Sequence, residues 1–374
     1  MIGLITFHAA YNFGSSLQAY ATQKTIKKLG YDNEIINYRL NNQIHYYGDL
    51  ITLQFGKKEF LRRLMCLPEV RARKARAKRY EAFIKRYLKI SKGEYHTFKE
   101  LSEADLKYDI LVAGSDQVWN EHCTAEFKTE PPDSILAYFL DFDKDPKTKR
   151  ISFSSSLGFM KEEEVRKYIP QLRRFRHLAL REKDGAEMIG KILGVKTSNT
   201  VDPTMLLTRD EWINDFKVGT RGTKQHYVLM YSLEKSPRKM IKIQKRVRDF
   251  AGGRKVICLS PFLSTHIKGI HMRNDAGPIE FLSLLIGADC MVTDSFHGTA
   301  FSVNLGIPFY TINTGRDHRK QLLLNRVGLE DQLIASVDSL AGRDIPSFDF
   351  HPAWDKLKAI RDESVDYLKN ALET

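Results

Sequence analysis

The sequence predicts an α/β protein built from two Rossmann-like domains that face each other across a cleft. Strand-like and helix-like patterns alternate along the chain, which is typical of parallel sheets with crossover helices. The alternation restarts near residue 209, and 374 residues are too many for one domain of ordinary size. We therefore expect an N-terminal domain over residues 1–207 and a C-terminal domain over 208–340. A last helix lies within 350–374, and the sequence leaves open whether it packs back on the N-terminal domain.

In the N-terminal half, residues 2–7 form the first strand candidate, and the polar loop 8–15 leads into a helix. That helix ends near Leu29, with Gly30 as its stop signal. The basic segment 57–92, a helical insertion, spaces its apolar residues by three and four. Four further short strands are expected, at 35–38, 109–113, 151–154 and 178–180, before a turn that Val201 opens.

The C-terminal half repeats this alternation. We expect strands at 227–231, 255–259, 290–293 and 309–312, and helices at 237–250, 280–285 and 354–372. The third strand runs into a polar turn at 294–298, followed by a helical pattern over 299–305. Gly306 and Pro308 then end that helix.

The composition is that of a soluble globular protein, with 42% hydrophobic and 28% charged residues. No apolar stretch approaches the ~20 residues that cross a bilayer. The first residues resemble a strand rather than a secretion signal. The four cysteines lie far apart and lack a CxxC pair, which favours reduced thiols in a cytoplasmic protein: Cys66, Cys123, Cys258 and Cys290. No HExxH, GxGxxG or Walker pattern is present, so we expect no metal, nicotinamide or P-loop site.

The net charge of +13 is concentrated in residues 57–92, which hold 14 lysines and arginines against three acids. One interpretation is the solvated face of ordinary amphipathic helices. The other is a surface that docks on anionic lipid head groups, or on the pyrophosphate of a lipid-linked acceptor, at the inner face of the cytoplasmic membrane. The rest of the chain is close to balanced and few aromatics interleave with 71–79, so we do not expect nucleic-acid binding.

The turn at 294–298 is the strongest candidate for a reaction centre. A strand that feeds a helix through small polar residues aims backbone N–H groups and the positive end of a helix dipole at one point, which suits a phosphate or carboxylate. His297 adds a group that exchanges protons near neutral pH. A lone histidine is more often structural, but its position in this turn favours catalysis. We predict His297 and Asp294 as catalytic, with Ser295 and Gly298 as substrate-binding residues.

Polar residues also follow the first and third strand candidates of the N-terminal half. Asn12 and Gly14 lie in the first loop, where Gly14 permits a close backbone approach, and a plain helix cap is the alternative. Ser115 and Asp116 either cap a helix or bind a sugar hydroxyl.

Two further segments offer binding groups. Ser154 and Ser155 place hydroxyls at a strand end, but the GxSxG spacing of a hydrolase nucleophile is absent. Arg181 directly follows a strand, where its guanidinium can hold a carboxylate or phosphate with two hydrogen bonds. The alternative is a surface pair between Arg181 and Glu182.

Taken together, these motifs resemble the polysaccharide pyruvyl transferase family. They occur in the family's order over roughly residues 3–330: NFGSSLQAYA (12–21), LVAGSDQVWN (111–120), SSSLG (154–158), ALREKD (179–184), VDPTMLL (201–207), GPIEFLSLL (277–285) and DSFHGTAFS (294–302). The DSFHG and GSDQVW segments are specific as a pair, whereas each alone is modest evidence.

The resemblance implies a fold similar to the GT-B glycosyltransferases. It also implies transfer of pyruvate from phosphoenolpyruvate to a sugar, usually as a ketal across two hydroxyls, in bacterial surface-polysaccharide synthesis. The acceptor would be a nucleotide- or polyprenyl-linked hexose, and no tightly bound cofactor is implied. The family's histidine corresponds to His297 and a substrate-binding arginine to Arg181, with Arg316 and Arg319 as candidates for a second basic group.

Two other functions stay open at this point. One is a nucleotide-sugar-dependent glycosyltransferase on the same GT-B-type fold, which would ignore phosphoenolpyruvate. The other is a sugar- or anion-binding protein without catalysis. The sequence also does not decide whether His297 or Asp294 acts as the acid or as the base.

Overall fold

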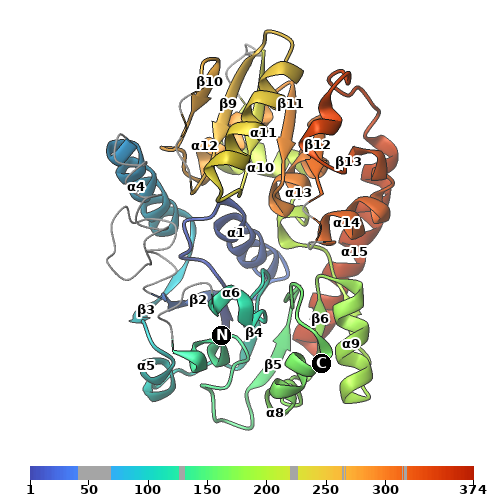
Figure 1. The fold of residues 1–374 in the computed structure, drawn as a ribbon. Helices are drawn as coiled ribbons and strands as arrows, with labels where there is room; N and C mark the ends of the chain where they lie inside the picture. Colours follow the sequence, from blue (N-terminus) through green and yellow to red (C-terminus); the bar gives the residue numbers. More distant parts are fainter. Residues whose placement is uncertain are drawn as a thin grey trace.

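A computed structural model of the chain describes residues 1–40, 69–125, 131–219, 226–262, 265, 267–313, 315 and 318–374. Two parallel sheets form the centres of two halves, and the long helix α1 (Phe13–Lys28) lies between them (Figure 1). The predicted fold class is therefore confirmed.

The N-terminal sheet has the strand order β3-β2-β1-β4-β5, and every pair in it is parallel. Its strands are β1 (Ile2–Ile5), β2 (Asn33–Tyr38), β3 (Ile90–Tyr95), β4 (Ile110–Ala113) and β5 (Lys149–Ser152). A small pair, β6 (Ala179–Leu180) and β7 (Ser198–Asn199), adjoins β5 through isolated bridges.

The C-terminal sheet has the order β10-β9-β8-β11-β12-β13, again all parallel. Counted along the chain, this is 3-2-1-4-5-6, the order of dinucleotide-binding Rossmann domains. Its strands are β8 (Tyr227–Tyr231), β9 (Lys255–Leu259), β10 (Ile270–Met272), β11 (Cys290–Thr293), β12 (Phe309–Ile312) and β13 (Leu333–Ile334). Both sheets consist largely of fully buried apolar runs, as expected where helices cover a parallel sheet.

Helices connect the strands in both halves. In the first half these are α1, α4 (Val70–Tyr87), α5 (Phe98–Glu103), α6 (Glu121–Ala125), α7 (Glu162–Val165), α8 (Ile169–Leu172) and α9 (Lys183–Leu193), with the short 3-10 turns η2 (Pro132–Ala137), η3 (Arg166–Tyr168) and η4 (Pro203–Met205). The second half has α10 (Arg209–Phe216), α11 (Pro237–Phe250), α12 (Pro278–Ile286), α13 (Phe296–Leu305), α14 (Arg319–Val327) and α15 (His351–Glu373), with η5 (Glu330–Gln332) and η6 (Val337–Leu340).

The start of α13 differs from the prediction. The sequence suggested a turn through residue 298, but the helix begins at Phe296, because the Ser295 side chain caps it by accepting from the Gly298 N–H at 3.3 Å. The end is as predicted, with Gly306 in the left-handed region at a φ of 64°. His297 consequently lies in the first turn of a helix rather than in a loop.

Helix α15 contacts both halves. Near its start, Trp354 Nε1 donates to the Val303 carbonyl in α13 at 2.9 Å. Near its end, the Tyr367 hydroxyl donates to the Ser152 carbonyl of β5 at 3.0 Å, and the chain terminus lies beside β5 (Figure 1). The second part of α15 therefore packs on the N-terminal half, the arrangement that the sequence left open.

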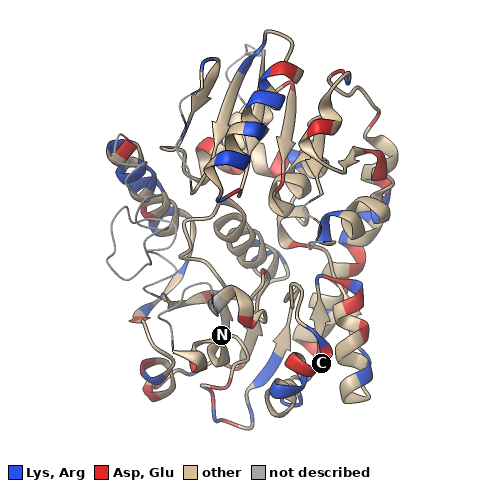
Figure 2. Cartoon of the chain, viewed as in Figure 1, with Lys and Arg blue, Asp and Glu red and all other residues tan. Residues whose placement is uncertain are grey.

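The basic segment is described from residue 69 onward, so the apolar residues expected between 57 and 68 lie outside the described residues. Figure 2 shows lysines and arginines along α4. Arg73 and Arg76 are buried and donate to the carbonyl of Pro261, at 3.2 and 3.4 Å, in the loop after β9. Arg79 pairs with Asp275 in the same half. These three arginines thus bind α4 to the C-terminal half and are not available to a membrane surface.

In the described part of the chain, no helix is both long enough and apolar enough to cross a membrane.

Candidate functional site

The candidate site lies where the carboxyl ends of the two sheets meet. Each sheet has one point at which the strand order changes direction. This switch point lies between β1 and β4 in the N-terminal sheet and between β8 and β11 in the C-terminal sheet. Loops that leave such a switch point form the ligand crevice of open parallel sheets. The N-termini of α1 and α13 follow β1 and β11, and they approach each other closely across the cleft.

Gly14 and His297 form the direct contact between these two helices. A Cβ atom added to Gly14 would lie 2.0 Å from Cγ of His297, so the imidazole packs against the bare Cα. The sequence predicted a close approach at Gly14, and the approaching group is this ring. Because helix N-termini attract anions, an imidazole between two of them is well placed to meet a phosphate or carboxylate.

The acidic partner of His297 is Asp202, in the turn before η4. Its Oδ2 atom lies 3.6 Å from Nε2 of His297, close enough to attract the ring but too far for a hydrogen bond. Nε2 has no hydrogen-bond partner among the described residues, although His297 is only 8% exposed. A buried donor or acceptor without a partner is costly, which indicates a group kept for a ligand.

Asp202 is firmly held. Its Oδ1 accepts from the backbone N–H and the hydroxyl of Thr204, at 3.0 and 2.7 Å, and its Oδ2 accepts from Nη1 of Arg181 at 2.7 Å. Burial alone would raise the pKa of Asp202, but His297, Arg181 and Thr204 lower it well below the usual range. Asp202 is therefore ionised and rigid, and it is suited to orient the imidazole.

Arg181 has less freedom than the sequence suggested. Its Nε donates to Glu182 at 3.0 Å and its Nη1 to Asp202, while its Nη2 has no partner among the described residues. The pair with Glu182 is thus real but buried, not a surface feature. Burial opposes the charge, yet Glu182, Asp202 and Asp116 raise the pKa of Arg181 above its usual value. Only one amino group is left for a ligand, so a two-pronged grip by Arg181 is not available.

Asp294 has other partners than the histidine. Its carboxylate accepts from the Ser232 hydroxyl at 2.6 Å and from the Leu233 N–H at 2.7 Å. Lys320 donates to its carbonyl at 2.9 Å. Burial raises the pKa of Asp294. Asp294 thus joins the ends of β8 and β11, and Asp202 takes the place beside His297 where the sequence suggested Asp294.

The first loop is arranged by side-chain caps. Asn12 accepts from the N–H groups of Gly14 and Ser15, at 3.0 and 3.4 Å, which starts α1 as the alternative interpretation proposed. The Ser15 hydroxyl donates to Asp116 at 2.6 Å. Asp116 has a φ of 77°, a region that non-glycine residues rarely adopt, so the loop after β4 is held in an unusual conformation beside α1.

The predicted serines are engaged within the protein. Ser154 donates to the Val201 carbonyl at 2.7 Å, Ser155 to the Ala113 carbonyl at 3.1 Å, and Ser115 to Asp202 at 3.4 Å. All three are completely buried. They hold the ends of β4 and β5 against the turn that carries Asp202, and none of them faces the cleft as a sugar ligand would require.

The remaining predicted residues have distinct places. Ser295 caps α13, and a Cβ at Gly298 would lie 2.5 Å from Oγ1 of Thr293, so that glycine allows the helix to pack on β11. The guanidinium groups of Arg181 and Arg319 lie 4.6 and 5.3 Å from the ring centre of Phe296, as cation–π contacts. Arg316 lies outside the described residues.

The structure adds residues that the sequence reasoning did not select. Asp202 was visible only as part of a turn motif, since nothing in a single sequence reveals which acid meets a histidine about a hundred positions away. The sequence also did not select Phe296, and it named Glu182 only as a surface partner of Arg181, whereas that pair is buried.

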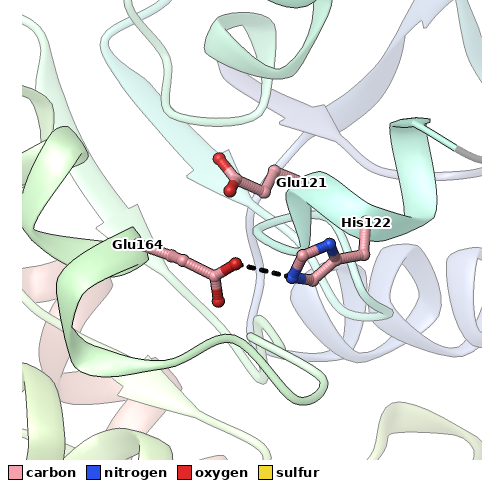
Figure 3. Close-up of side chains that lie close together, drawn as sticks. All are labelled: Glu121, His122 and Glu164. Carbon is pink, nitrogen blue, oxygen red and sulfur yellow. Dashed lines mark ion pairs between the residues drawn. The ribbon is translucent and has the colours of Figure 1, made fainter.

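Within the described residues, one group of possible metal ligands lies elsewhere, in the N-terminal half (Figure 3). His122 pairs with Glu164 at 2.8 Å, and Glu121 accepts from Lys167 and from Tyr168, both at 2.9 Å. The second oxygen of Glu164 accepts from a backbone N–H at 2.7 Å. Protein partners thus account for this cluster.

The two Rossmann-like halves, with helix N-termini and a histidine meeting in the cleft, define a protein of GT-B-like architecture. The crystal structure of Methanocaldococcus jannaschii UDP-GlcNAc 2-epimerase, in complex with UDP-GlcNAc and UDP, has this fold: it is 12% identical, the match covers 96% of this chain and 98% of that one, and the TM-score is 0.52. Two further structures are similar. One is a putative UDP-N-acetylglucosamine 2-epimerase from Listeria monocytogenes, with 13% identity, coverage of 97% of this chain and 96% of that one, and a TM-score of 0.48. The other is the E. coli heptosyltransferase WaaC with ADP, with 12% identity, coverage of 97% and 100%, and a TM-score of 0.42. Identities this low show the fold alone.

The family model for polysaccharide pyruvyl transferase matches residues 12–316, which is most of the chain. This chain therefore belongs to the polysaccharide pyruvyl transferase family, as its motifs indicated, and the family implies a transferase. No curated protein matched the sequence.

Proposed function

We propose that this protein transfers pyruvate from phosphoenolpyruvate to a hexose as a ketal, in the synthesis of a bacterial surface polysaccharide. Family membership supports the reaction class. The observation that carries the proposal further is the unpartnered Nε2 of His297, which lies between two helix N-termini and beside ionised Asp202. A dianionic or trianionic donor matches that arrangement.

The reaction needs a group that donates a proton to phosphoenolpyruvate and groups that hold its negative charge. A sugar hydroxyl adds to C2 of phosphoenolpyruvate while C3 gains a proton and becomes a methyl group. A second hydroxyl of the same sugar then replaces the phosphate at C2, which leaves as inorganic phosphate and completes the ketal. Both steps develop positive character at C2, and proton transfer to C3 or to the departing phosphate is work for a general acid.

In this proposal His297 is the catalytic residue and moves a proton through Nε2. Asp202 is a positioning residue, because it lies beside the ring but is buried too deeply to meet a sugar. Asp294 keeps some exposed surface, and its pKa, which burial raises, suits an acid that holds its proton or a base for the sugar hydroxyl. Arg319 and the free amino group of Arg181 contribute positive charge for the donor.

The acceptor is proposed to be a nucleotide- or polyprenyl-linked hexose. Among structures with similar folds, that of the archaeal epimerase contains UDP-GlcNAc and UDP. For a lipid-linked acceptor, the exposed side of α4 supports peripheral contact with anionic lipid at the inner membrane face, and so a cytoplasmic location. That side carries Arg71, Lys74, Lys78 and Lys85, spaced as one helical face.

The test is phosphate release from phosphoenolpyruvate across a panel of nucleotide- and polyprenyl-linked hexoses, with no metal or organic cofactor added. Release that depends on one acceptor supports the proposal. Donor-dependent release of a nucleoside diphosphate, without use of phosphoenolpyruvate, would instead identify a glycosyltransferase. Ligand binding without any turnover would leave a sugar- or anion-binding protein.

A further inference from the structure

A cavity lies beside Phe296 and the turn that carries Asp202. It has a volume of about 230 Å³ and lies between the start of α9, the segment before η4 and one face of α14. Drug-sized sites occupy ~300–1,000 Å³, so this cavity fits a small anion or one end of a larger substrate. Its lining includes Asp202 and Phe296, which ties it to His297.

Apolar and basic side chains line the cavity together. Its apolar lining includes Val201, Met205, Leu322 and Leu323. Its four basic residues are Arg181, Lys183, Arg319 and Arg326. Its two acids, Glu182 and Asp202, both pair with Arg181. The net formal charge of the lining is therefore positive.

Arg326 is the most informative of these basic residues. It is half-buried, and its Nη1 donates to the side-chain oxygen of Asn199 at 2.7 Å. It forms no ion pair with any residue that the structure describes, whereas Arg181 has two carboxylates. Burial lowers the pKa of Arg326, and Glu363 offsets this only in part. A partly buried cation beside a cavity, with no described carboxylate within ion-pair distance, is stabilised when an anion enters.

A second, independent feature points to the same ligand chemistry. Arg181 lines the same cavity, and its Nη2 is buried without a hydrogen-bond partner among the described residues. Arg319 and Arg326 are seven residues apart, two turns of α14, and so present their side chains on one face of that helix. Three guanidinium groups thus surround one cavity, and guanidinium groups are the preferred partners of phosphate.

We propose that this cavity binds the phosphate-bearing end of a substrate, with Arg326 as a residue that determines its affinity. The identity of the two candidate substrates, the donor and the activated sugar, rests on the proposed function. The phosphate belongs either to phosphoenolpyruvate or to the diphosphate of the activated sugar. Both have the same chemistry, and the following experiment separates them.

The experiment measures binding of phosphoenolpyruvate and of inorganic pyrophosphate by calorimetry, without turnover. The variants are Arg326→Gln, which removes the charge, and Arg326→Lys, which keeps it. Arg248→Gln is the matched control, since Arg248 lies on α11, has a side chain that is 41% exposed and pairs with its neighbour Asp249. Urea denaturation of each variant shows that it is folded under the binding conditions.

We expect Arg326→Gln to weaken binding of one of the two anions by about ten- to a hundredfold, which is the loss of one charge-assisted hydrogen bond. Arg326→Lys should lose less, and Arg248→Gln nothing. A loss confined to phosphoenolpyruvate identifies the donor end, and a loss confined to pyrophosphate identifies the acceptor end. If wild type binds neither anion, or Arg326→Gln binds both as well as wild type does, the proposal is overturned. If wild type shows no turnover of phosphoenolpyruvate but binds pyrophosphate in a way that depends on Arg326, the anion-binding role of the cavity stands and the proposed pyruvyl transfer is wrong.

Discussion

Replacing Asp202 with asparagine tests the arrangement around His297 most selectively. Asparagine keeps the shape and one carbonyl oxygen, so both contacts with Thr204 remain possible. It removes the negative charge that Arg181 binds at 2.7 Å and that faces His297 at 3.6 Å. The side chain of Asp202 is 1% exposed, so water cannot replace what is lost.

The expected cost in stability follows from this burial. Breaking a buried ion pair typically costs ~3–5 kcal/mol. Glu182 still neutralises Arg181 in the variant, so we expect the lower end, about 3 kcal/mol. Because folding lowers the pKa of Asp202, its contribution is complete above the unfolded pKa of about 4 and is lost as the pH falls through the folded value. The difference between wild type and variant should therefore be constant between about pH 5 and 8, and shrink in stronger acid.

The assay pairs urea denaturation with steady-state kinetics over a range of pH. We expect kcat to fall by about a hundredfold and its pH profile to shift, because the imidazole loses the charge that orients it. Asp338→Asn is the matched control: Asp338 also binds two cations, Lys242 and Arg246, but is 41% exposed, so it should cost less than about 1 kcal/mol and leave kcat unchanged. A folded Asp202→Asn protein with wild-type kcat and an unshifted pH profile would refute the positioning role.

Three further changes have defined outcomes. His297→Ala should leave the protein folded and lower kcat by ~10²–10⁴, measured with phosphoenolpyruvate saturating. Gly14→Ala should destabilise by about 1–3 kcal/mol through its clash with the imidazole, and His297→Ala in the same chain should remove most of that cost, measured by urea denaturation as a double-mutant cycle. Neutralising the exposed face of α4 with glutamine should abolish salt-sensitive co-sedimentation with anionic vesicles: Arg71, Lys74, Lys78 and Lys85.

Each of these has an outcome that contradicts it. Near-normal turnover of His297→Ala removes the residue from the mechanism. Additive costs of the two substitutions in the Gly14 cycle mean that the ring does not cause the strain. If wild-type protein does not co-sediment with anionic vesicles at low salt, the exposed face of α4 is only a solvated surface.

Long apolar runs made the centre of each sheet predictable. Strands β8, β9 and β12 and helix α11 have the bounds expected from the sequence, since each is an uninterrupted apolar run or a strongly amphipathic segment between clear stop signals. The sheet edges were not predicted. β3 (Ile90–Tyr95) alternates poorly and is only partly buried, and β10 and β13 have three and two residues, too few to form a pattern.

The site was predictable to the level of loops but not of contacts. Strand-to-helix turns identified His297 and Gly14, because the carboxyl ends of parallel strands collect ligands. Asp202 pairs with His297 only because η4 packs against α13 from the other half of the chain, which no local pattern records. Likewise, the sequence shows that α4 carries many positive charges. Which of them are buried, as Arg73 and Arg76 are, and which form an exposed face depends on how that helix packs.

The most direct test of the central claim follows the carbon skeleton of the donor. Wild-type protein and His297→Ala are incubated with phosphoenolpyruvate labelled with ¹³C in its three carbons and with the acceptor identified by phosphate release, and the sugar product is analysed by mass spectrometry and NMR. The proposed function predicts that all three labelled carbons appear in the acceptor as a ketal with one methyl group, at an initial rate equal to that of phosphate release, and that His297→Ala forms almost none. Phosphate release with the label recovered as free pyruvate, or a labelled ketal formed equally well by the variant, would contradict it.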